Sequence, residues 1–387
     1  MRKAIARRAG AGALHSAYAF DGLRAVLIVL VVAGHAVIAF VNATPGLPWP
    51  VRDRPWGWVF DVLAWWLLGV TIPAFLVLAG ITLEALAGTM APAKLLRNRA
   101  RRLVAPFLLA AVVLLPLTYA VFSLGWYASG RCTWKEIFQL RFHDPEIKAN
   151  LWGPAHLWFL EFLIICTFGI IALRELAQRW RQRPRASTAP TEGARVEARA
   201  LALGLAGMVA VVAGIIWATP AICTRYTNSF LPEPGRLLFA GAFMAGGMWL
   251  HRHRSALGLL ARWSWPLLVL SQLAFVPAAA QLLRVLRDGL APAWTLLAPA
   301  IGGFVVLAAA GSLGLTVRLY RRSHPSLRFL AEASAWIYLS NLPVVALLQV
   351  ELLYLQLHPL AKFVIVVMGT LAIILPAFHL LRRRATR

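Results

Sequence analysis

The sequence predicts an all-α membrane protein, a bundle of about ten transmembrane helices. Of its 387 residues, 60% are hydrophobic, whereas an average soluble domain has roughly 45–50% apolar residues. Several apolar segments reach the ~20 residues that a helix needs to span a bilayer. The formal charge of +24 is concentrated in the connections between these segments. This placement argues for a membrane topology and against nucleic acid as a partner.

The apolar segments and the charges between them also predict the orientation. We expect ten spans, with approximate ends, at 23–41, 58–86, 103–123, 157–174, 201–219, 235–250, 264–283, 294–317, 334–353 and 360–381. About two thirds of the 39 Lys and Arg residues lie in the two termini and in every second connection. By the positive-inside rule, both termini are cytoplasmic. The first segment is too long for a usual signal peptide, so we expect it to remain as the first helix.

Residues 1–387 are expected to form a single integral-membrane domain, with two long connections of different character. Residues 175–200 are polar and charged, which predicts a flexible cytoplasmic linker. Residues 124–156 lie on the opposite, periplasmic side. Aromatic residues are dense there, and they fit either an ordered cap or a belt at the membrane interface: Trp126, Tyr127, Trp134, Phe138 and Phe142.

The most informative stretch is residues 18–40, which begins with Asp21 and Arg24 and then stays apolar apart from His35. Eleven helical steps of about 100° make roughly three turns, so Arg24 and His35 share one face about 16 Å apart. An ionisable side chain within a span usually faces the bundle interior or a wet cavity. We therefore interpret His35 as functional, although a structural histidine bonded to a neighbouring helix is the alternative.

A second cationic stretch, residues 94–107, precedes the third span. It reads KLLRNRARRLVAPF, with four arginines in six residues and a proline just inside the membrane. Arg99 and Arg102 are three residues apart and so share a helical face. Positive-inside topology explains part of this charge, but guanidinium groups also bind phosphate oxygens in a bidentate way. The stretch predicts a polyanion site at the cytoplasmic side.

Together these stretches resemble the acyltransferase-3 family of membrane-bound acyltransferases and, within it, the branch that contains glucan biosynthesis protein C. The resemblance rests on DGLRAVLIVLVVAGH at 21–35 and on the arginines at 99–102 followed by a proline. It rests further on GPAHLWFLEFLI at 153–164 and SAWIYLSNLPVV at 334–345. These motifs are spread over most of the chain in the family order. One position departs from the pattern, because Asn341 stands where the family leads us to expect a histidine.

The resemblance implies transfer of an acyl group, acetyl or succinyl, from cytoplasmic acyl-CoA to a hydroxyl of a periplasmic or cell-surface glycan. The location it implies is the bacterial inner membrane. His35 would act as the general base or as a transient acyl carrier. Arg24, Arg99 and Arg102 would hold the phosphates of the donor. Asp21 would orient the Arg24 guanidinium, or would only complement the helix dipole.

The acceptor is expected at the outer start of the fourth span. There Glu161 would contact sugar hydroxyls beside His156, and Trp158 would stack on a pyranose face; an interfacial tryptophan with a solvated carboxylate is the alternative. Asn341 can orient an acceptor by hydrogen bonding but cannot take up a proton near neutral pH.

The remaining expectations concern cysteines, metals and partners. Cys132 and Cys223 both fall in outward connections, so a disulfide between them is predicted for an oxidising periplasm. The histidines show no metal-ligand spacing, so no metal is expected, and there is no nucleotide-binding glycine motif. The co-substrate that the resemblance implies is acyl-CoA, either acetyl-CoA or succinyl-CoA. Expected partners are membrane lipid and the glycan acceptor, and a homodimer is left open.

Two other classes of function are considered beside the enzyme. A secondary transporter or a flippase for a sugar or lipid-linked sugar would also use ionisable groups at membrane depth. The chain shows no repeat symmetry, and its cationic cluster lies at one mouth rather than at the midplane, which favours the enzyme. A structural scaffold would leave His35 and the arginines unexplained.

Overall fold

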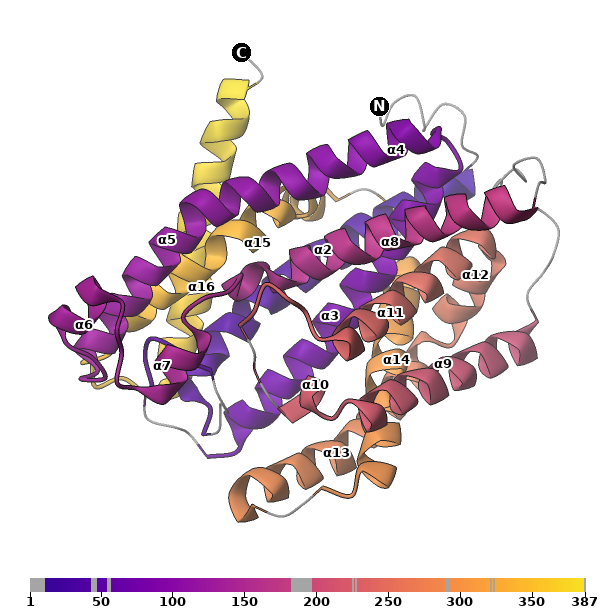
Figure 1. The fold of residues 1–387 in the computed structure, drawn as a ribbon. Helices are drawn as coiled ribbons and strands as arrows, with labels where there is room; N and C mark the ends of the chain where they lie inside the picture. The colour runs from indigo at the N-terminus through magenta and orange to yellow at the C-terminus, as the bar shows by residue number, and fades with distance from the viewer. Residues whose placement is uncertain are drawn as a thin grey trace.

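The computed structural model describes residues 11–42, 47–53, 57–181, 197–224, 226, 228–289, 292–320, 322 and 324–385, and within these ranges it contains helices and no strands. The fold class is therefore confirmed as an all-α bundle. Figure 1 shows the long helices packed side by side.

The long helices correspond to the predicted spans. They are α2 (Ala11–Ala36), α3 (Val59–Ala87), α5 (Ala105–Ala128), α8 (Trp158–Arg181), α9 (Ala198–Ala218), α11 (Pro234–Arg252), α13 (Ser264–Asp288), α14 (Trp294–Leu319), α15 (Pro325–Glu351) and α16 (Pro359–Ala385). Nine helices of the described part are long and apolar enough to cross a membrane, and α11 is the one predicted span that is not among them. At 19 residues α11 is the shortest of these helices, and its glycines and the polar Arg236, His251 and Arg252 leave it without a long apolar stretch.

Short helices complete the chain. They are η1 (Val37–Phe40), α4 (Pro92–Arg99), the π-helical turn η2 (Ala100–Val104), α6 (Trp134–Gln139), α7 (Pro145–Asn150), η3 (Ala155–Leu157), α10 (Ala221–Thr224) and α12 (Ser255–Arg262). In Figure 1 the continuous run of α4 and α5 ends beside α6 and α7. We call the end of the bundle that carries α6 and α7 the cap end. The opposite end, where Arg24, Arg99 and Arg102 lie, is the arginine end.

The bundle is built around α14 and α15. Helix α14 is the most buried span, and it packs against α13, α9, α12, α3 and α2. Helix α15 packs against α2, α5 and α16. Helix α2 contacts both α14 and α15, so the helix that carries His35 lies at the junction of the two groups. The two largest clusters of buried apolar side chains follow the same division.

Two glycines let α3 and α11 approach closely. A Cβ atom on Gly80 would collide with the backbone of Met244, and a Cβ on Gly247 would collide with the carbonyl of Val77. Small residues at such a crossing bring two backbones into van der Waals contact, the usual device of membrane helices. Helix α11 is thereby held in the bundle although it is not strongly apolar.

A buried ion triad joins three helices near the arginine end. Glu84 of α3 is fully buried and pairs with Arg174 of α8 and with Arg252 of α11, whose Nε lies 2.8 Å from Glu84 Oε1. Two cations around one buried carboxylate offset its desolvation, whereas an isolated charge there would be costly. The triad fixes α8 and α11 against α3.

The segment between α5 and α8 forms an ordered cap rather than a simple interfacial belt. Trp126 is 1% exposed and donates to the carbonyl of Pro48 at 3.1 Å, whereas Phe138 is 82% exposed. Arg131 binds Asp144 and Glu146 at 2.7 and 3.0 Å and also donates to the Trp49 carbonyl. The buried aromatic residues and these ion pairs attach the segment to the connection that follows α2.

The predicted linker at 175–200 is largely helical where the structure describes it. Helix α8 continues to Arg181, so residues 175–181 are helical rather than flexible. Sequence reasoning ended the span at residue 174 because polar residues follow, but a helix extends beyond the membrane when its outer turns are solvated. Helix α9 begins at Ala198, and residues 182–196 lie outside the described ranges.

Candidate active site

His35 lies in the last turn of α2, and its tautomer is set by Asn341 of α15. Its Nδ1 is 2.5 Å from Asn341 Oδ1, and Asn341 Nδ2 donates to the carbonyls of Ile337 and Tyr338, both at 2.8 Å. Because carbonyls only accept, the amide cannot be turned the other way, and its oxygen faces the imidazole. His35 Nδ1 must therefore be the donor. In the neutral ring, Nε2 is left with the lone pair, which is what a general base needs.

The plane of the His35 ring is held by a second contact. Trp49 stacks on it with ring centroids 6.4 Å apart and 23° between the planes. Trp49 Nε1 donates to Gln349 Oε1 at 2.8 Å, and Gln349 Nε2 donates to the carbonyl of Ala36 at 2.9 Å. Sequence reasoning missed both residues, since a single tryptophan in a connection and a glutamine near a helix end carry no distinctive spacing.

His156, in η3, is the second histidine of the site. It is 5% exposed, and its ring stands edge-on to that of His35 with centroids 6.3 Å apart. Its Nε2 donates to the carbonyl of Leu339 at 2.9 Å, while its Nδ1 is buried without a hydrogen-bond partner among the described residues. Tyr338 donates its hydroxyl to the His156 carbonyl at 2.7 Å. Helix α15 thus positions both imidazoles, through residues two positions apart.

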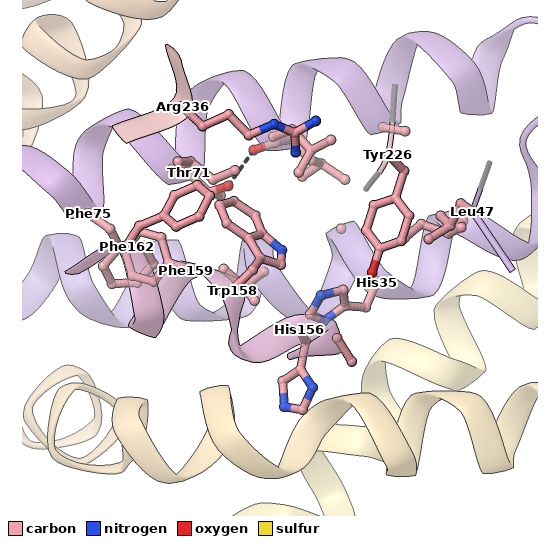
Figure 2. Close-up of a pocket in the computed structure, with 18 of the residues that line it drawn as sticks. His35, Leu47, Thr71, Phe75, His156, Trp158, Phe159, Phe162, Tyr226 and Arg236 are labelled. Atoms are coloured by element: carbon pink, nitrogen blue, oxygen red, sulfur yellow. Dashed lines mark hydrogen bonds between the residues drawn. The ribbon is translucent and has the colours of Figure 1, made fainter. Parts of the chain in front are cut away.

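One cavity of about 670 Å³ passes through the site. At the arginine end it is lined by Arg102, Leu103 and Pro106, and His35 and His156 line it nearer the cap end, where α2 ends and α8 begins. Near the cap end it is lined by polar residues that include Asn228 and Arg236. Figure 2 shows His35, His156, Trp158 and Arg236 around the same space. A mostly apolar cavity with few polar groups is the usual form of a small-molecule site.

The polar mouth near the cap end is held by two asparagines. Asn228 donates through its amide nitrogen to the Asn150 carbonyl at 2.8 Å, and its backbone nitrogen donates to Asn150 Oδ1 at 3.0 Å. Asn228 Oδ1 also accepts from the backbone of Ala155 at 2.8 Å, next to His156. These bonds tie the connection after α10 to the start of η3.

Three arginines gather at the other end of the cavity. Arg24 donates to Thr82 Oγ1 at 3.2 Å and lies 3.7 Å from Asp21. Arg99 donates to Asn98 at 3.1 Å, its Nε is buried without a partner among the described residues, and the charges of Arg102 and Arg24 act on it. Mutual repulsion of this kind favours a bound anion. The π-helical turn η2 contains Arg102, and such turns are frequent at functional sites.

The predicted residues at the arginine end lie far from His35. Asp21 is fourteen residues before His35 on the same helix, roughly 21 Å away, so it cannot act on the reacting atoms and instead pairs with Arg24. Of the three predicted donor-binding arginines, only Arg102 lines the cavity, with the other two beside it.

Of the residues predicted to bind the acceptor, Trp158 lines the cavity and Glu161 does not. Trp158 lines the cavity and packs edge-on against Phe162 with centroids 5.2 Å apart. Glu161 does not line the cavity; it is 8% exposed, and its Oε2 has no partner within the described part of the chain. Its predicted contact with sugar hydroxyls therefore has no support from its position.

The predicted disulfide is wrong, because both thiols are free in the structure. Cys132 is buried in the apolar cluster of the cap, whereas Cys223 packs against the other large cluster. Location on the same side of the membrane does not bring two thiols together. Burial raises the pKa of Cys223 to about 12, so this thiol is a poor nucleophile. Among the described residues no group of His, Cys, Asp or Glu could hold a metal ion.

The fold and the cavity define a class of protein: a multi-pass membrane protein with an oriented histidine in a cavity that runs from one end of the bundle toward the other. A family model described as an acyltransferase domain matches residues 17–379. The chain therefore belongs to the acyltransferase-3 family, and its general activity is acyl transfer. No curated protein and no solved structure matches the chain. Membership of the family is confirmed, and the narrower glucan biosynthesis branch stays a prediction.

Proposed function

We propose that the protein transfers an acetyl or succinyl group from acyl-CoA, bound at the arginine end, to a hydroxyl of a glycan that enters at the cap end. In this proposal the arginine end is cytoplasmic, the cap end is periplasmic, and the membrane is the bacterial inner membrane. The observation that carries the proposal is the His35–Asn341 bond, which leaves the basic Nε2 of His35 available in a cavity that reaches both groups of polar residues.

The positive charge at the arginine end supports the proposed donor site. Coenzyme A carries several phosphate groups, and Arg24, Arg99 and Arg102 offer clustered guanidinium groups whose mutual repulsion a polyanion would relieve. Arg102 stands where the cavity begins, so the thin pantetheine arm can extend from the phosphates into it. The thioester would then approach His35, about 16 Å along α2 from Arg24.

Aromatic and polar side chains at the cap end support the proposed acceptor site. Trp158 gives a flat aromatic face, and Asn228 and Arg236 give polar groups around the same cavity. Sugar rings stack on aromatic faces by their C–H groups and bond to amides and guanidinium groups by their hydroxyls. The acceptor hydroxyl would lie next to His35, with His156 on its other side.

The chemistry follows from the tautomer of His35. Nε2 removes the proton of the acceptor hydroxyl as its oxygen attacks the thioester carbon, and the tetrahedral adduct collapses with loss of the coenzyme A thiolate. The imidazolium then returns its proton to the thiolate, so the histidine ends neutral. Transfer through an acyl-histidine is the second route: Nε2 attacks the thioester first, and the acceptor hydroxyl releases the acyl group afterwards.

The test is mass spectrometry of cell-envelope glycans from cells that contain the protein, lack it, or carry His35→Ala. We expect one acyl mass to be absent from a glycan in both the deletion and the variant cells, which identifies the acyl group and the acceptor together. Identical glycans in all three strains would contradict the proposal. A cavity that reaches both ends would also suit a flippase; in that case a glycan would change in amount across the membrane without losing an acyl group.

A further inference from the structure

The cavity has a side branch that the acyl-transfer chemistry does not use. Besides the residues around His35, its lining includes apolar side chains from three helices that do not carry the site histidines. These are Trp65, Leu68 and Ile72 of α3, Phe275, Ala278 and Leu282 of α13, and Ile301 and Phe304 of α14. We call these residues the apolar branch. Apart from the indole N–H of Trp65, these side chains offer no hydrogen-bonding group to a coenzyme A phosphate or a sugar hydroxyl.

The branch extends from the cap end toward the middle of the membrane. Leu68 is nine residues from the start of α3, roughly 14 Å along the axis, and Leu282 is six residues from the end of α13, roughly 9 Å. Both helix ends lie at the cap end, and the hydrocarbon core is about 30 Å thick. A hydrocarbon chain in this branch would therefore come from the leaflet at the cap end, where the proposed acceptor enters.

The branch is continuous with the lipid-facing surface. Leu68 lines the cavity and is 49% exposed, so the cavity reaches the outside of the bundle at that residue. On α13 the neighbouring Leu273 and Val276 are 64% exposed, while Phe275 and Ala278 are buried against the branch. Helix α13 packs closely on α14 and touches α3 at few places. A chain can thus enter between α3 and α13 without leaving an apolar environment.

One hydrogen bond joins the two helices beside the branch. Trp66 Nε1 of α3 donates to Gln272 Oε1 of α13 at 3.0 Å. Trp66 lies nearer the cap end of α3 than the lining residues Leu68 and Ile72, so this bond fixes α13 against α3 alongside the branch.

From this position we infer that the acceptor is attached to a membrane lipid, and that the apolar branch binds the hydrocarbon chain next to its sugar. The inference rests on the proposed function, since it assumes a sugar acceptor at His35. Apolar contact is as favourable in lipid as in the branch, so the gain comes from shape and from placing the sugar, rather than from the hydrophobic effect. The chain holds the sugar beside His35, which raises its effective concentration there.

The test uses the full-length protein in phosphatidylcholine vesicles with acetyl-CoA and succinyl-CoA, and two acceptors that share one sugar. Dodecyl glucoside carries a hydrocarbon chain, and methyl glucoside does not. Ala278→Phe fills the branch, and Leu270→Phe, on the lipid-facing side of the same helix at 51% exposure, is the matched control. We expect Ala278→Phe to lower transfer to dodecyl glucoside by about tenfold or more and transfer to methyl glucoside by less than twofold. The control should change neither rate.

Equal loss with both acceptors, or no loss with either, would overturn the inference. A second measurement does not depend on the folding of a variant: dodecyl glucoside with a photoreactive group at the end of its chain should label the wild-type peptide that contains Phe275 and Leu282. Labelling spread evenly over the lipid-facing helices would also overturn it. If the wild type acylates neither glucoside while the label still marks this peptide, the proposed function fails and the chain site stands.

Discussion

The two ends of the cavity carry different kinds of polar groups. Around the site histidines the polar groups are held by specific hydrogen bonds: His35 to Asn341, and His156 to Leu339. The cation at that end, Arg236, is paired with Glu233 at 3.2 Å. At the arginine end the polar groups are cations that repel one another, Arg99 beside Arg24 and Arg102. The first arrangement directs the lone pair of His35 Nε2, and the second would favour a bound polyanion.

In the proposed function, this difference lets one cavity serve two substrates of unlike chemistry. A highly charged donor would be retained where guanidinium groups gather, and only its uncharged arm would need to enter the apolar interior. An uncharged sugar hydroxyl would meet the unprotonated Nε2 of His35, which could take its proton. A substitution at one end of the cavity should therefore leave the property of the other end unchanged.

The largest effect is expected at the cap end, from His35→Ala. Removing the base should lower the rate of acyl transfer by 10²-fold or more, and donor affinity should stay at the wild-type value because the arginines are untouched. The measurement is transfer from radiolabelled acyl-CoA by the purified variant, with donor binding followed by calorimetry. A well-folded variant that transfers at a near-normal rate would refute the assignment of the base.

Asn341→Leu should give the next largest effect. The leucine keeps the volume of the amide but removes the acceptor for His35 Nδ1, so the ring can adopt the other tautomer. We expect kcat to fall roughly 10- to 100-fold, equivalent to about 1.5–3 kcal/mol in the transition state, with an unchanged KM for the donor. Steady-state kinetics with varied donor concentration measure both constants. A change in KM alone would assign Asn341 to donor binding instead.

What the sequence alone can predict depends on how far apart along the chain the interacting residues lie. The ten helices and the pairing of Arg24 with His35 on one face follow from periodicity along a single segment. The partner of His35 could not be predicted, because Asn341 lies 306 residues away and reaches it only through the packing of α15 on α2. The same limit explains Trp49 and the failed pairing of Cys132 with Cys223. These depend on tertiary positions that periodicity does not encode.

At the arginine end we expect a smaller change, confined to donor binding. Arg99→Lys and Arg102→Lys each keep the positive charge but lose the planar group that bonds two phosphate oxygens. The KM for the acyl-CoA donor should rise about tenfold, the value of one charge-assisted bond, while kcat stays within twofold. Arg97→Lys is the control, because Arg97 is exposed in the same helix α4 and its charge is not among those that act on Arg99. If both variants bind the donor as tightly as wild type does, the arginines serve only to orient the protein in the membrane and do not bind the donor.

The smallest effect concerns the cap itself. Hydrogen bonds from the backbone nitrogens of His143 and Thr133, at 2.9 and 2.8 Å, lower the pKa of Glu136 to about 2. Because the folded pKa lies below the ordinary value of 4.5, this contribution is complete above pH 4.5 and is lost as the pH falls toward 2. Limited digestion with pepsin should therefore cut the α6 segment more readily at pH 2 than at pH 4.

Glu136→Gln tests this assignment, since an amide does not titrate in that range. The variant should be cut at both pH values to a similar, higher extent than wild type at pH 4. Equal protection of wild type and variant at pH 4 would show that the carboxylate does not hold the cap. Transfer activity near neutral pH should change little, because the cap residue lies outside the cavity lining.

The central claim is that one cavity joins a donor site at the arginine end to a base that serves the cap end. It is tested most directly in sealed vesicles with the protein in one known orientation and radiolabelled acyl-CoA only on the side of the arginine end. We predict that the label appears on an acceptor supplied only on the opposite side, and that His35→Ala abolishes this transfer. Transfer that occurs only when donor and acceptor share one side would contradict the account.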